Sequence, residues 1–160
     1  MLTLSAEQLA AEFGRNVWVI HRHTDDLTHA ESLIQPPFPH NCLNWVLGHI
    51  MQNRDDLLKL LGAQPVLNQT EAGCYQRGSE AVTADAPVVV DFVRLRQLLD
   101  EQQQRLADAF AKSAADAMAR KVGDNTLGET VRVLYFHDAY HTGQIDMLRQ
   151  VAGKNDAILK

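Results

Sequence analysis

Two histidines near the C-terminal end of the chain, His137 and His141, have the types and spacing of residues that could bind one metal ion. They are four positions apart, so on an α-helix both imidazoles share one face, about 6 Å apart along the axis. Both fall near the middle of an apolar arc formed by Leu127, Val131, Leu134, Ile145 and Leu148 and widened by Val133 and Val151. Because buried imidazoles need hydrogen-bond partners or a metal, this pair requires one or the other.

A third histidine, His49, lies on the shoulder of an earlier apolar stripe that also has helical periodicity. Three neutral imidazoles and a water form an open site, which proteins use where one coordination position must stay free for chemistry. Zinc and nickel suit imidazole best, and iron, copper and manganese also bind it. The alternative interpretation is that each histidine is a separately satisfied core residue.

The composition bounds the kind of protein that these residues belong to. With 160 residues, 46% of them apolar, the chain is long enough for one domain with a sizeable core, and we expect residues 1–160 to form it. A net charge of −5 without a basic face argues against nucleic acid as a partner. No apolar stretch approaches the roughly 20 residues that cross a bilayer, so we expect no membrane contact.

The cellular setting that we expect is the cytoplasm. The first residues lack the basic start and apolar middle of a signal peptide. Cys42 and Cys74 are the two cysteines, and a single pair is weak evidence for a disulfide in a cytoplasmic protein, so we expect both to be free thiols.

Amphipathic periodicity predicts the elements that position the histidines. We expect helices over residues 5–27, 41–61, 91–112 and 126–153. Capping boxes are predicted at Ser5 with Gln8 and at Thr126 with Glu129. We find no convincing strand. The fold class that follows is all-α, a four-helix bundle, whose interior commonly holds metal sites.

A long irregular segment, residues 62–90, separates the second and third predicted helices. It either lines a pocket over the bundle or is plain connecting structure, and the residue pattern favours neither. Candidate pocket residues are Trp45 and Asn53, by helical phase, and Tyr75 and Arg77, by loop position. A further histidine group, His21, His23 and His29, is expected to form a solvated helix end.

Two motifs make the chain resemble the DinB/YfiT-like family of metal-dependent enzymes over nearly its whole length. Residues 43–50, with Trp45, Gly48 and His49, are similar to the family's Trp-x-x-Gly-His segment. Residues 137–145 are similar to its His-x-x-x-His-x-Gly-Gln segment. The resemblance implies an up-down-down-up bundle, ligation of a divalent metal by His49, His137 and His141, and frequent homodimers. Family members include thiol-dependent S-transferases, a maleylpyruvate isomerase and many proteins without a known substrate.

The function that we expect is that of a metal-dependent enzyme acting on a small molecule, either an S-transferase that uses a low-molecular-weight thiol or a hydrolase. Neither cysteine has an identifiable activating partner, so a protein nucleophile is not expected. The alternative is a non-catalytic, metal-stabilised bundle that acts as a binding or stress-response protein.

Asp138 creates a competing motif, because His137-Asp138-x-x-His141 is close to the His-Glu-x-x-His of zinc proteases. The aspartate is one methylene shorter than glutamate, and no usual third protease ligand follows, so a protease is disfavoured. Asp138 would then either orient a histidine ligand or be a partly exposed residue, and the second reading is slightly favoured.

Overall fold

The protein is described by a computed structural model that covers residues 5–113 and 116–159; residues 1–4, 114–115 and 160 of the predicted domain lie outside the described residues. Its fold confirms the all-α prediction, with a very small two-stranded sheet as the exception. The elements are α1 (Ala6–Thr24), α2 (His29–Ser32), α3 (Leu43–Leu60), α4 (Gln69–Cys74), α5 (Phe92–Lys112), the 3-10 helix η1 (Ala117–Ala119), β1 (Lys121–Val122), β2 (Asn125–Thr126) and α6 (Leu127–Val151).

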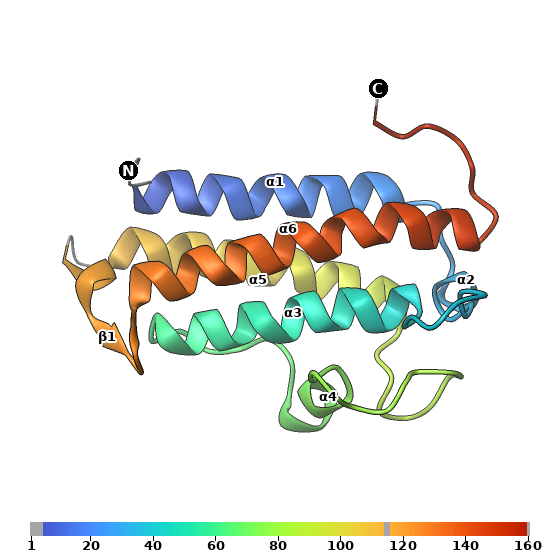
Figure 1. The fold of residues 1–160 in the computed structure, drawn as a ribbon, viewed down its shortest axis with the longest axis horizontal. Helices are drawn as coiled ribbons and strands as arrows, with labels where there is room; N and C mark the ends of the chain where they lie inside the picture. The colour runs from blue at the N-terminus through green and yellow to red at the C-terminus, as the bar shows by residue number, and fades with distance from the viewer. Residues whose placement is uncertain (1–4, 114–115, 160) are drawn as a thin grey trace.

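The long helices α1, α3, α5 and α6 lie side by side along the long dimension of the molecule (Figure 1). Helix α6 packs against α3 and α1, and α5 packs against the same two helices from the other side. In Figure 1, α1 and α6 run in one direction and α3 and α5 in the opposite one. The two motif-bearing helices, α3 and α6, are therefore antiparallel neighbours.

Local sequence signals set most helix starts. Both predicted capping boxes are present, Ser5 with Gln8 at α1 and Thr126 with Glu129 at α6. Asp91 caps α5 by accepting hydrogen bonds from two backbone amides. Helix α3 begins later than predicted, at Leu43, and Cys42 gives it no side-chain cap.

Two local predictions were wrong, and the irregular segment of residues 62–90 carries a short helix of its own, α4. The first helix ends at Thr24 rather than residue 27, because Thr28 and Glu31 form a capping box that starts the separate helix α2. The segment before α6 forms an antiparallel hairpin in which Lys121 pairs with Thr126, where no strand was expected. Gly123 has φ 60° in its turn, a conformation that favours glycine.

The buried apolar side chains form two clusters. One gathers Phe13, Leu57, Leu106, Phe110, Leu127 and Val131, and the other gathers Ile20, Leu47, Met51, Tyr75, Leu99 and Ile145, among others. Along α1, α3 and α6, the polar residues Asn16, Arg54 and Asp138 fall between the two clusters. No helix in the described part of the chain is long and apolar enough to cross a membrane.

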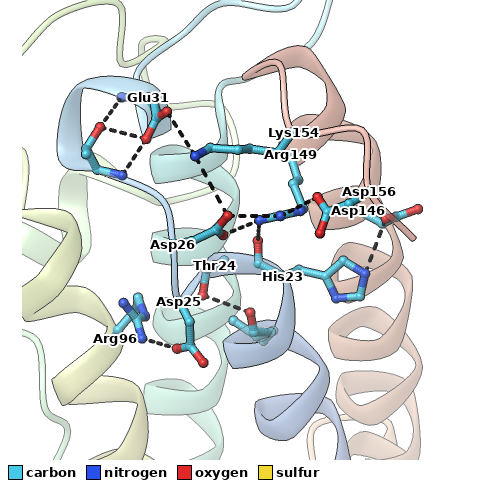
Figure 2. A network of polar contacts seen from close by, with 12 residues as sticks. His23, Thr24, Asp25, Asp26, Glu31, Arg96, Asp146, Arg149, Lys154 and Asp156 are labelled. Carbon is cyan, nitrogen blue, oxygen red and sulfur yellow. Dashed lines mark hydrogen bonds and ion pairs between the residues drawn. The ribbon is translucent and has the colours of Figure 1, made fainter. Parts of the chain in front are cut away.

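The prediction of a solvated histidine end on α1 was wrong for His23, which is buried in a polar network at the ends of α1 and α6 (Figure 2). Its Nδ1 lies 2.8 Å from the Val19 carbonyl, and its Nε2 lies 3.2 Å from a carboxylate oxygen of Asp146. The neighbouring Arg149, also buried, donates to Asp26 and to Asp156. Figure 2 shows how this arginine joins the segment after α6 to the segment after α1.

Candidate metal centre

The structure brings His49, on α3, together with His137 and His141, on α6, into a group that could hold a metal ion. One ring nitrogen from each residue lies within 4.8 Å of the others, and the Nε2 atoms of His49 and His137 are 3.1 Å apart. A tetrahedral zinc ion with bonds of about 2.1 Å holds its ligand nitrogens about 3.4 Å apart. The three imidazoles are therefore close enough that one ion could contact all of them.

Backbone contacts fix the orientation of the His49 ring. Its Nδ1 lies 2.7 Å from the carbonyl oxygen of Tyr75. Because a carbonyl can only accept, neutral His49 carries its hydrogen on Nδ1 and presents the lone pair of Nε2 to the other two histidines. Trp45 stacks on a face of the same ring, with centroids 4.6 Å apart. This tautomer is the one that a metal-ligating histidine needs.

Gly48 explains how Tyr75 comes so close. A Cβ atom at position 48 would lie 2.3 Å from the Tyr75 ring, which is far inside van der Waals contact. The ring is buried, and its hydroxyl donates to Asn44 and accepts from the backbone N–H of Val90. The segment 62–90 is thus anchored to α3, and one of its carbonyls positions His49. This contact answers the question that the sequence left open, because the segment helps to build the site.

The other two histidines differ in how their second nitrogens are satisfied. The Nδ1 of His141 lies 2.6 Å from the side-chain oxygen of Gln144, which leaves Nε2 of His141 free of its hydrogen. The Nδ1 of His137 is buried and has no hydrogen-bond partner among the described residues. The interpretation that each histidine is separately satisfied in the core therefore does not hold for His137.

Burial keeps the three imidazoles neutral. It lowers the pKa of His49 and His137, and it lowers that of His141 to about 4. Mutual repulsion between the ring charges acts in the same direction at His137 and His141. Neutral imidazole is the form that binds a metal ion, so the group is ready for ligation at neutral pH.

The three histidines lie on the wall of an open cleft of about 630 Å³. Of the predicted pocket residues, Trp45 and Arg77 line this cleft. Asn53 does not line it, and its side chain donates to the backbone carbonyl of His49. Tyr75 acts from behind through its carbonyl.

Several cleft residues were missed by the sequence reasoning: His40, Asn41, Val133, Phe136, Tyr140 and Gln144. Those on α6 could have been predicted from their helical positions relative to His137 and His141. Phe136 and Tyr140 precede the two histidines by one position each, and Gln144 is three positions after His141, on the same side of the helix.

The preferred reading of Asp138 as a partly exposed residue was wrong. Its side chain is buried, accepts from Nδ2 of Asn16 at 2.8 Å, and pairs with the buried guanidinium of Arg54. Arg54 also donates to the carbonyl of Phe13 at 3.0 Å. Asp138 therefore joins α1, α3 and α6 through Arg54 and Asn16.

The fold and the site define an all-α protein with a cleft-facing group of three histidines that could hold a metal ion. The sequence model of the DinB superfamily matches residues 10–145, and the chain belongs to that superfamily. No curated protein gave a significant match.

Proposed function

We propose that His49, His137 and His141 bind a divalent metal ion, zinc or nickel in the first place and otherwise iron or manganese, and that the protein is a metal-dependent enzyme acting on a small molecule. The observation that carries the proposal is the direction of three neutral imidazoles toward one point on the wall of an open cleft. Three protein ligands leave a coordination position for a reacting group, as in catalytic rather than structural zinc sites.

The residues of the cleft support transfer of a low-molecular-weight thiol over hydrolysis. A bound divalent ion would lower the pKa of a thiol that reaches it, giving a thiolate at neutral pH. None of the described residues that line the cleft is an aspartate or glutamate, so a carboxylate base for activating water is missing there. A thiolate needs no such base, because it is already the nucleophile.

The nucleophile would come from a small molecule, because neither cysteine of the chain is placed for the role. Cys42 is buried and donates its thiol hydrogen to the Val82 carbonyl. Burial raises the pKa of both Cys42 and Cys74, and neither lines the cleft. The chain's own contribution is to hold the His49 ring through Tyr75 and the His141 ring through Gln144, and to cover one face of the His49 ring with Trp45.

The experiment that tests this function uses protein purified without an affinity tag. Bound metal is quantified, and conjugation of 2-mercaptoethanol to a chromogenic electrophile is measured before chelation, after chelation and after metal is restored. We expect about one metal per chain and turnover that is lost and recovered with the metal. Equal, negligible metal content in wild type and His137→Ala would contradict the proposal.

A non-catalytic, metal-stabilised protein is the second candidate, and one observation favours it. The histidines come from two helices, so an ion would cross-link α3 to α6 and contribute to stability without turnover. In that case chelation would lower the melting temperature sharply while no thiol and electrophile pair was turned over.

We also propose the up-down-down-up bundle topology, a homodimer and a cytoplasmic setting. The helix directions in Figure 1 support the topology. Two exposed apolar side chains on one side of α6, Phe136 at the cleft and Met147, support a contact with a second copy. The free state of both cysteines is in keeping with a reducing compartment.

A further inference from the structure

The charge around the cleft differs from that of the chain as a whole. The chain has 20 acidic and 15 basic residues, yet the described residues that line the cleft include no acidic one. They include Arg77 and His40 beside the three histidines of the metal centre. Because the three histidines of the centre are neutral, Arg77 gives the cleft a positive charge that no lining carboxylate offsets, and such a charge raises the local concentration of anions.

We propose that the cleft takes a small molecule with an oxyanion group, such as a carboxylate, sulfonate or phosphate, and that Arg77 binds this group. The inference rests on the proposed function, since it names the class of molecule that would approach the three histidines. Trp45, Val133 and Tyr140 form the apolar part of the same cleft, so the molecule carries its oxyanion on a short apolar body.

Arg77 has the placement of a ligand-binding residue. Its backbone lies between two anchored positions. The Tyr75 carbonyl is bonded to His49, and the Ser79 hydroxyl accepts from the Trp45 indole at 2.9 Å and lies 2.8 Å from the Cys74 carbonyl. The residue is thus fixed at the cleft by its neighbours, while its own side chain is exposed.

The guanidinium of Arg77 is also available for a ligand. In the described part of the chain, no carboxylate lies within ion-pair distance of it, whereas Arg94 and Arg96 are paired with Glu71 and Asp25. A planar guanidinium can donate two parallel hydrogen bonds to a carboxylate, which a lysine cannot do.

The test compares thiols that differ in charge. Metal-loaded wild-type protein is titrated calorimetrically with 3-mercaptopropionate, 2-mercaptoethanesulfonate and neutral 2-mercaptoethanol. The two anionic thiols are expected to bind about tenfold more tightly than the neutral one, the gain typical of a charge-assisted hydrogen bond. The carboxylate and the sulfonate together show whether Arg77 accepts oxyanions in general or carboxylates alone.

The variants assign the preference to Arg77. Arg77→Gln is expected to abolish it while changing the affinity for 2-mercaptoethanol less than about twofold, and Arg77→Lys to keep part of it. Arg22→Gln is the matched control, because it removes one exposed positive charge from α1, a helix that contributes no residue to the cleft, and should change nothing. A wild type without preference, or an Arg77→Gln variant that weakens all three thiols equally, would overturn the inference and leave the metal-thiol function standing.

A separate arm keeps the inference testable if the proposed function fails. Metal-free protein is titrated with 3-phenylpropionate and with 3-phenylpropan-1-ol, which have the same apolar body. Preference for the anion in wild type and its loss in Arg77→Gln would support the oxyanion site in the absence of any metal or thiol. Equal affinities for the acid and the alcohol would count against it.

Discussion

At the scale of single residues, the metal centre depends on the close contact between Tyr75 and Gly48, which has no side chain. Gly48 lets the Tyr75 ring lie against α3, and the Tyr75 carbonyl holds His49 in the tautomer that presents Nε2. Gly48 and His49 of the motif on α3 therefore both serve the metal centre. Gly48 leaves room for the segment that contains Tyr75, and the Tyr75 carbonyl orients His49.

Gly48→Ala should lower both stability and metal affinity. The added methyl group must displace the Tyr75 ring, which overpacks the core at a cost of about 1–3 kcal/mol. Displacement of the Tyr75 carbonyl removes a partner of His49, a kind of loss that typically reduces metal affinity about 10- to 100-fold. Urea unfolding and competitive zinc titration measure the two effects.

Gly143→Ala provides the control, because a Cβ at this helical position meets nothing within 4 Å. It should leave zinc affinity unchanged and raise stability by up to about 1 kcal/mol through helix propensity. If both glycine variants behaved alike, the role assigned to Gly48 would be wrong.

The pH dependence of metal-free protein should reveal the half-buried His141. Burial lowers its pKa to about 4, against an unfolded value near 6.5. Between these values the unfolded chain binds more protons than the folded one, so stability rises with pH across this window and is lost as pH falls through it. Chelator-treated wild type should lose more stability between pH 7 and pH 5 than His141→Gln in urea titrations. Equal losses would show that His141 does not titrate as inferred.

At the scale of elements, the sequence predicted the two helices that carry the site but not what holds them. Helical period and the Thr126–Glu129 capping box predicted α6, and the spacing of His137 and His141 predicted their shared face. The contact between the Tyr75 carbonyl and His49 could not be predicted, since every residue has a backbone carbonyl and the residue type does not indicate which one is used. Short elements such as α4 and the hairpin carry too few residues for a period to be visible.

The burial of Asp138 was hidden by a different cause. Helical phase placed it at the edge of the apolar arc, and only the packing of three helices reveals that Arg54 and Asn16 occupy the same layer. A charged residue at the edge of a helix's apolar face is predicted to be exposed unless its partner on another helix is known.

Asp138→Asn should destabilise the protein by about 3–5 kcal/mol, because it leaves the buried guanidinium of Arg54 without its carboxylate. Metal affinity should change little, since the carboxylate contacts Arg54 and Asn16 rather than a histidine ring. Thermal unfolding and zinc titration separate the two roles. A variant of normal stability that had lost its metal would return Asp138 to the role of orienting a ligand.

At the scale of the whole molecule, the cleft lies beside the exposed outer face of α6. Phe136, which also lines the cleft, is 70% exposed, and Met147, three helical turns further on and on the same side of α6, is 36% exposed. A second copy packed on this face would cover them close to the metal centre. The proposed dimer and the proposed site would then share one helix.

Phe136→Glu should convert the dimer to a monomer, because it places a charge in the contact. Sedimentation equilibrium gives the mass directly. Trp18→Glu, a change at another exposed aromatic residue, on α1, serves as the control and should leave the mass unchanged. A wild type that sedimented as a monomer would contradict the proposed dimer without touching the metal centre.

The measurement that tests the central claim most directly is X-ray absorption spectroscopy of zinc-loaded, untagged protein. The account predicts three imidazole nitrogens at about 2.0–2.1 Å with one further light ligand, and replacement of that ligand by sulfur at about 2.3 Å when 2-mercaptoethanol is added. His137→Ala should lose the three-imidazole signature. A zinc ion closed by four protein ligands, or unchanged by the thiol, would contradict an open three-histidine centre.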